Sequence, residues 1–171
     1  MNLADWTLTT FEQMLGTFDH VLDKAAGDPR GEALLSERLA DDMQPLATQV
    51  RFAGHQVVNT LNRLTGTALP TADTDPATIA EARAQLAELR ELIRATAPAA
   101  FAADDAPVEF DLPNGMVFAL TAAEYARDWS LPQFYFHVTS AYAILRKAGV
   151  PLGKADYIGY IARHAKLPAT A

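Results

Sequence analysis

The stretch LPQFYFHVTSAYAILRKAG, residues 131–149, decides the fold of this 171-residue chain. Proline is tolerated in the first turn of a helix and glycine commonly ends one, so Pro132 and Gly149 are expected to bound one helix that runs to about Ala148. Its apolar residues cover more than one stripe; they are Phe134, Val138, Ala141 and Leu145, with Phe136, Tyr142 and Ile144 beside them. A helix that is apolar nearly all round is covered on several sides. We therefore expect this helix to be the most buried of the chain and to form a dimer surface as well.

Three amphipathic helices are predicted upstream of this stretch. They are expected over Thr7 to Ala26, Met43 to Thr65 and Asp75 to Ala97, with Asp42 as the N-cap of the second and Asp75 as the N-cap of the third. Each carries apolar residues three or four positions apart, which places them on one face. The stripes are Leu8, Phe11, Leu15, Phe18, Leu22 and Ala25, then Met43, Leu46, Val50, Ala53, Val57, Leu61 and Leu64, then Ile79, Ala82, Leu86, Leu89, Ile93 and Thr96. The pattern predicts an all-α four-helix bundle.

A small β-hairpin is predicted between the third and fourth helices. Apolar and acidic residues alternate from Val108 to Leu112, the dipeptide Asn-Gly at 114–115 is a strong turn signal, and an apolar run returns to Leu120. Two strands alone are marginally stable, so the hairpin is expected to lean on the helices. Thr121 and Glu124 have the spacing of a capping box, which predicts a short helix directly after the hairpin.

Composition and length exclude several classes of protein. The net charge of −7 disfavours nucleic acid as a partner, and the absence of cysteine excludes disulfides, thiolate nucleophiles and cysteine-based zinc sites. No apolar run approaches the roughly 18 residues of a membrane span, and the N-terminus lacks the pattern of a signal peptide, so no membrane association and a cytoplasmic location are expected. Residues 1–159 are predicted to form one domain, followed by a C-terminal tail over 160–171. Lys154 and Asp156 are expected to be surface or capping residues.

Two histidines are candidates for a functional site. His137 lies roughly 60° from the centre of its apolar stripe, at the edge of the core, with Gln133 one turn before it. The alternative is a half-buried histidine that one hydrogen bond satisfies. His55 lies roughly 150° from its stripe and is expected to face solvent. No His-x-x-x-His pair is present, so a zinc site of two histidines on one helix is excluded.

Residues 131–146 together with 149–159 resemble an uncharacterised domain-of-unknown-function family within the DinB/YfiT-like metalloenzyme superfamily. Residues 38–46 with Gln49 and Val50 resemble its helix-two signature, and the resemblance extends over nearly the whole chain to Gly159. It implies a four-helix bundle of up-down-down-up order, often paired as a homodimer.

The resemblance also implies a divalent metal, zinc or nickel, held by three histidines. One comes from the second helix and two come from an i, i+4 pair on the fourth. His137 resembles the later histidine of that pair, whereas Gln133 stands at the earlier position and Gln49 at the helix-two position. Glutamine is a poor ligand for zinc or nickel, so this set is expected to bind such metals weakly.

Three functions follow as hypotheses. In the first, the bundle binds a small molecule or a partner at a site that has lost the three histidines, lined by His137, Gln133, Gln49 and Tyr135. In the second, the protein is a metal-dependent thiol transferase or hydrolase, in which His137 and His55 or a carboxylate converge on the metal. In the third, the chain is a structural homodimer without catalytic activity.

Overall fold

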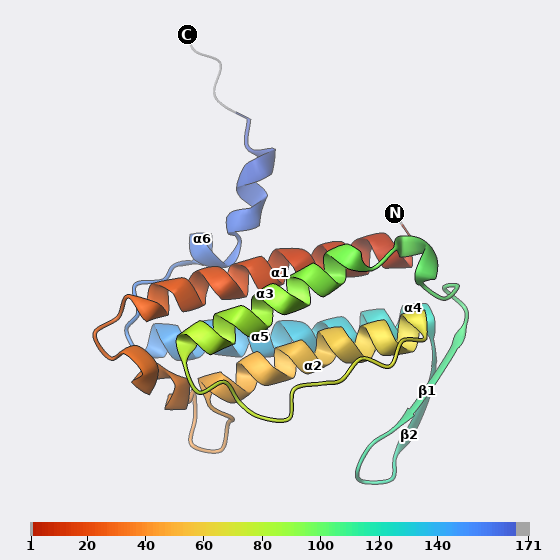
Figure 1. Cartoon of the computed structure of the whole chain (residues 1–171), viewed down its shortest axis with the longest axis horizontal. Coiled ribbons are helices and arrows are strands. Elements are labelled where there is room, and N and C mark those ends of the chain that lie inside the picture. Colours follow the sequence, from red (N-terminus) through yellow and green to blue (C-terminus); the bar gives the residue numbers. More distant parts are fainter. Residues whose placement is uncertain (1, 167–171) are drawn as a thin grey trace.

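The computed structural model describes residues 2–166, which are mostly helical (Figure 1). Four long helices lie side by side: α1 Leu3–Ala26, α2 Leu46–Thr65, α3 Ile79–Ala95 and α5 Leu131–Lys147. The shorter elements are the 3-10 helices Gly31–Ser36, Pro98–Ala100 and Gly159–His164, the single-turn helices α4 Ala122–Glu124 and α6 Lys154–Tyr157, a π-helical turn at Tyr125–Ser130, and the strands β1 Pro107–Asp111 and β2 Val117–Thr121. None of the helices within residues 2–166 combines the length and the apolar character that a membrane crossing needs.

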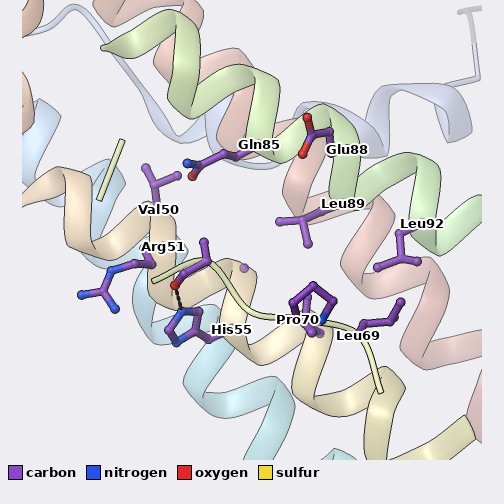
Figure 2. A pocket seen from close by; sticks show the side chains of 12 residues that line it. Val50, Arg51, His55, Leu69, Pro70, Gln85, Glu88, Leu89 and Leu92 are labelled. Atoms are coloured by element: carbon purple, nitrogen blue, oxygen red, sulfur yellow. Dashed lines mark hydrogen bonds between the residues drawn. The ribbon is translucent and has the colours of Figure 1, made fainter. Parts of the chain in front are cut away.

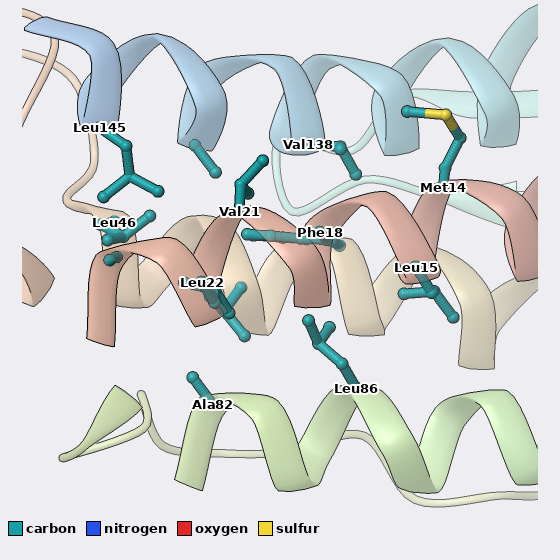
Figure 3. Packing of buried hydrophobic residues seen from close by; sticks show 14 of the residues in the cluster. Met14, Leu15, Phe18, Val21, Leu22, Leu46, Ala82, Leu86, Val138 and Leu145 are labelled. Carbon is teal, nitrogen blue, oxygen red and sulfur yellow. The ribbon is translucent and has the colours of Figure 1, made fainter. Parts of the chain in front are cut away.

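The predicted apolar stripes meet in one core between the four long helices (Figure 3). α2 packs mainly on α5, and α3 packs mainly on α1. Phe11 of α1 meets Phe134 of α5 edge to face, with ring centroids 4.8 Å apart. Figure 3 labels ten members of the core, namely Met14, Leu15, Phe18, Val21, Leu22, Leu46, Ala82, Leu86, Val138 and Leu145. Helical phase alone therefore identified most of the residues that stabilise the fold.

α5 is buried on one side only, which corrects the expectation that it is covered nearly all round. Phe134, Val138 and Ala141 have no exposed surface, whereas Phe136 is 56% exposed and Tyr135 is 38% exposed. Each helix that packs around a shared core keeps an outer side, and the extra aromatic residues of α5 lie there.

Residues 66–78, here named the strap, connect α2 to α3 and run back along α2 (Figure 1). Their partners on α2 come progressively earlier in the helix as the strap advances. The pairs are Asn62 with Leu69, His55 with Ala72, and Arg51 and Thr48 with Asp75. The strap therefore brings the start of α3 close to the start of α2, so that both helices begin at the same end of the molecule.

The predicted N-caps Asp42 and Asp75 are both wrong. α2 begins directly after Pro45, whose extended backbone (ψ 168°) occupies the cap position, and Asp42 lies exposed in the turn before it. α3 begins after Thr78, whose hydroxyl oxygen accepts a hydrogen bond from the Glu81 backbone at 3.0 Å. Asp75 fails as a cap because its carboxylate binds α2 instead, and the helix starts only after Thr78.

Two capping boxes define other helix starts. The box of Thr121 and Glu124 is present as predicted, and it begins α4 directly after the second strand. A second box, between Asn2 and Asp5, was not predicted, and it starts α1 before Thr7. Each box satisfies backbone N–H groups that the first turn of a helix leaves without partners.

The predicted hairpin is confirmed. β1 and β2 pair antiparallel, with Phe110 opposite Phe118, and Gly115 takes the left-handed conformation (φ 83°) at the turn. Phe110 packs on Tyr125 and Trp129, with ring centroids 5.6 and 4.9 Å away, and the guanidinium of Arg63 lies 4.9 Å from the centroid of the Phe110 ring. These contacts form a second hydrophobic cluster through which the hairpin leans on the helices.

The C-terminal segment, residues 150–166, is attached to α1 through Asp156. Its carboxylate accepts hydrogen bonds from the backbone of Gly153 at 2.7 Å, from His20 at 2.8 Å and from Lys24 at 2.9 Å. The capping role expected of Asp156 is therefore confirmed. The predicted tail begins as a 3-10 helix over Gly159–His164, and its last residues, 167–171, lie outside the described part of the chain.

Candidate functional site

His137 and Gln49 meet at the contact between α5 and α2. The Nδ1 atom of His137 lies 2.9 Å from Oε1 of Gln49, and Nε2 of Gln49 donates to the carbonyl of Gln44 at 3.0 Å. A carbonyl oxygen only accepts, so the amide nitrogen of Gln49 must face Gln44 and its oxygen must face the imidazole. His137 therefore carries its proton on Nδ1 and keeps the lone pair on Nε2.

The environment keeps this imidazole neutral. Burial, with a smaller contribution from nearby His55, lowers the pKa of His137 to about 4. A base of this pKa is neutral at neutral pH and accepts protons poorly there. The Nε2 lone pair is thus suited to accept a hydrogen bond or to bind a metal, and it is poorly suited to general-base catalysis near pH 7.

The other predicted pocket residues divide between two places. Gln133 accepts a long hydrogen bond from Gln56 at 3.4 Å and so lies on the same α2–α5 contact as His137. Tyr135 makes no hydrogen bond or ring contact with α2 among the described residues, and its ring lies beside Phe134, with centroids 6.3 Å apart. Burial, together with Tyr160 and Tyr157 nearby, raises the pKa of Tyr135, which places it beside the C-terminal segment. The structure brings His137, Gln133 and Gln49 to one interface and separates Tyr135 from them.

His55 lies on the outer side of α2, as predicted, but the strap covers it, so it is half buried rather than free in solvent. Its Nε2 donates to the carbonyl of Ala72 at 2.7 Å. The phenyl ring of Phe52 contacts both imidazoles, with ring centroids 5.6 Å from His55 and 5.4 Å from His137. The expectation of full exposure failed because the strap follows no periodic pattern that would reveal its path.

The donors at the α2–α5 contact do not fit zinc or nickel. They are one imidazole and the two amides of Gln49 and Gln133, and amide oxygens are weak ligands for these metals. Within residues 2–166, no three histidine or acidic side chains gather in a way that could hold a metal ion.

A cavity of about 240 Å³ lies between α2, α3 and the strap (Figure 2). Its wall is mainly apolar, and Figure 2 shows Leu89 pointing into it from α3 and Pro70 bounding it from the strap. Polar groups lie at His55, Gln85 and Glu88. The complete lining is Val50, Arg51, Gly54, His55, Val58, Leu69, Pro70, Ala72, Gln85, Glu88, Leu89 and Leu92.

The cavity exists because α2 and α3 each pack mainly on another helix, which leaves a groove between them for the strap to cross. Gly54 provides further room, since a Cβ atom at this position would lie 3.2 Å from Cδ1 of Leu89. Sequence reasoning did not find this cavity. A glycine inside a helix and a long connection without hydrophobic periodicity were its only signals.

Comparison with known proteins is consistent with this fold. The family model for a domain of unknown function (DUF1993) matches residues 3–158. The chain is also similar to the crystal structure of a DinB family member protein from Shewanella denitrificans, at 33% identity and a TM-score of 0.79 over 99% of this chain and 95% of the other. No curated protein matches the chain. The chain therefore belongs to the DUF1993 family and is DinB-like, as its residues 131–159 predicted.

Proposed function

We propose that this protein binds a small molecule in the cavity between α2, α3 and the strap. The observation that carries the proposal is a cavity of about 240 Å³ with a mainly apolar wall and a few polar groups. Binding sites for small molecules commonly combine these features. The volume is below the ~300 Å³ at which sites for drug-sized ligands begin, so the ligand is small. In this proposal the four long helices form the up-down-down-up bundle of the DinB/YfiT-like superfamily.

The polar groups of the cavity favour a ligand that donates hydrogen bonds. His55 uses Nε2 toward Ala72, which leaves Nδ1 as an acceptor, and Glu88 adds a carboxylate at the rim. Arg51 donates through Nε to Asp75 at 2.6 Å, so much of its charge is already neutralised. The ligand class is accordingly a compact apolar molecule that carries a hydroxyl or an amino group.

The test uses three probes with the same aromatic body: benzylamine, phenol and benzoate. Benzylamine and phenol are expected to shift the backbone amide signals of Gly54 and Leu89 in a nitrogen–proton NMR titration. Benzoate is expected to bind about tenfold more weakly, because Glu88 repels its carboxylate. A titration in which none of the probes moves these signals removes the proposal.

A pair of leucine substitutions provides the matched control. Gly54→Leu fills the space toward Leu89 and is expected to abolish the benzylamine shifts, whereas Ala87→Leu on the exposed side of α3 is expected to preserve them. Equal thermal unfolding midpoints would show that both variants fold. Unchanged benzylamine binding by folded Gly54→Leu would place the ligand elsewhere.

The α2–α5 contact is a second candidate, which the orientation of His137 favours. Gln49 directs the Nε2 lone pair of a neutral, partly exposed imidazole away from the amide. A ligand with a donor group would bind this nitrogen, in keeping with the position of the superfamily site. The same titrations test it, since such a ligand would shift the ring signals of His137 and leave those of Gly54 unchanged.

A further inference from the structure

A cavity of about 530 Å³ lies between α1, α3 and the C-terminal segment, away from the strap. We name it the C-terminal crevice. Glu12 and His20 line it from α1, Arg90 from α3, and Asp156, Tyr160 and Arg163 from the C-terminal segment. Figure 1 shows this segment projecting from the bundle beside α1, and its residues Asp156, Tyr160 and Arg163 line one side of the crevice. Charged side chains of both signs therefore line a single cavity.

The carboxylate of Asp156 already accepts hydrogen bonds from neighbouring groups of the protein. Hydrogen bonds from His20, Lys24 and the backbone of Gly153 hold the pKa of its carboxyl well below the ordinary value. These bonds attach the C-terminal segment to α1. Asp156 accordingly builds the wall of the crevice and offers little to a ligand.

Only one of the two carboxylate oxygens of Glu12 has hydrogen-bond partners among the described residues. Its Oε1 accepts hydrogen bonds from Nε and Nη2 of Arg90, at 3.2 and 2.9 Å, and from Arg94 at 2.6 Å. Its Oε2 is buried and has no hydrogen-bond partner among the described residues. Burial raises the pKa of Glu12, but the two arginines outweigh it and lower the pKa, so the carboxylate is ionised. A buried charged oxygen without a hydrogen-bond partner destabilises the folded protein, so Oε2 would gain from a donor group.

Arg163 is a positively charged residue that lines the same crevice as Glu12. Its Nε donates to the ring of His164 at 2.9 Å, and within residues 2–166 no carboxylate lies at ion-pair distance from its guanidinium. The crevice thus contains one acceptor that lacks a donor and one cation that lacks an anion.

We propose that the C-terminal crevice binds a small zwitterion, an amino acid whose ammonium group pairs with Glu12 and whose carboxylate pairs with Arg163. An anion alone would leave Oε2 of Glu12 without a partner, and a cation alone would meet Arg90 and Arg163. Oε2 is closed to solvent, so the ligand engages Glu12 when the whole side chain swings into the crevice. This movement replaces the bonds of Oε1 to Arg94, which is 49% exposed, and to Arg90, which is 29% exposed, by a bond to the ammonium group of the ligand.

Calorimetric titration with a series of probes tests the proposal. Glycine, γ-aminobutyrate and ε-aminocaproate carry the two charges at increasing separation, and butyrate and butylamine carry one charge each. At least one of the zwitterions is expected to bind about tenfold more tightly than both singly charged probes. If butyrate or butylamine binds as tightly as the best zwitterion, or if none of the zwitterions binds, the proposal is overturned.

Single substitutions then identify the contacts. Glu12→Gln and Arg163→Gln are each expected to weaken the best zwitterion about tenfold, whereas Glu109→Gln and Arg127→Gln, at exposed positions outside both cavities, are expected to leave its affinity unchanged. Arg163 is exposed, and within residues 2–166 its side chain bonds only the neighbouring His164, so Arg163→Gln decides the question if Glu12→Gln fails to fold. Unchanged affinity in folded Arg163→Gln would refute the proposal.

Discussion

At the scale of single residues, burial at the contact between α5 and α2 determines how His137 responds to pH. Burial and nearby His55 lower the pKa of His137 from 6.5 to about 4, and its Nδ1 proton is donated to Gln49. Between these two pH values the unfolded chain binds a proton at this residue and the folded chain does not. The stability that neutral His137 allows is therefore complete above about pH 6.5 and is lost as the pH falls toward 4.

His137→Gln is expected to reduce this acid sensitivity, because glutamine does not titrate and can still donate a hydrogen bond to Gln49. Between about pH 7 and pH 4.5 the variant should lose about 1–2 kcal/mol less unfolding free energy than the wild type, a value reduced from the full shift because the ring is partly exposed. Urea denaturation at both pH values measures the difference. His164→Gln, at an exposed histidine, is the control, and an equal acid loss in wild type and His137→Gln would contradict the assignment.

The sequence located part of the candidate site, because helical phase placed His137 and Gln133 at the edge of the core and the family resemblance added Gln49. His137, Gln133 and Gln49 were predicted to share one interface, and they lie at the contact between α5 and α2. The bond of Gln49 to the Gln44 carbonyl could not be predicted, because it depends on side-chain rotamers. The covering of His55 was missed for another reason, since a connection without periodicity gives no signal of its path.

At the scale of elements, the strap depends on a few polar anchors. Asp75 accepts hydrogen bonds from Thr48 and from Arg51, both at 2.6 Å. Burial raises the pKa of Asp75, but these bonds outweigh it and lower the pKa, so the carboxylate is charged at neutral pH. The same element explains the failed cap prediction, since a sequence pattern cannot tell whether an aspartate binds its own helix or another.

Asp75→Asn is expected to loosen the strap while the core remains folded. Neutralising the carboxylate weakens its bond to Arg51, at a cost of about 1 kcal/mol. Amide hydrogen exchange should accelerate in residues 66–78 and stay unchanged in α1. Asp73→Asn provides the control, because Asp73 is exposed in the same element. If the amides of residues 66–78 exchange at the same rate in Asp75→Asn and Asp73→Asn, Asp75 does not anchor the strap.

At the scale of the whole molecule, two hydrophobic clusters carry the fold. The main core joins the four long helices, and the second cluster joins the hairpin to α4 and the π-helical turn. The sequence predicted the main core and a hairpin that rests on the helices, because periods of 3.6 and 2 residues identify helices and strands independently, but it did not predict which residues form the second cluster. The sequence did not predict the groove between α2 and α3. The groove depends on which pairs of helices pack closely, and helical periodicity does not specify those pairs.

The two clusters are expected to respond differently to loss of an aromatic ring. Phe134 is fully buried between α1 and α5, so Phe134→Ala should lower the unfolding free energy by about 3–5 kcal/mol and weaken amide protection in all four long helices. Phe110 holds the hairpin against Tyr125 and Trp129, so Phe110→Ala should expose the amides of residues 107–121 first. Hydrogen exchange followed by mass spectrometry distinguishes these patterns. Equal loss of protection in the long helices of both variants would mean that hairpin and bundle unfold together, because the cluster around Phe110 would then stabilise the entire molecule.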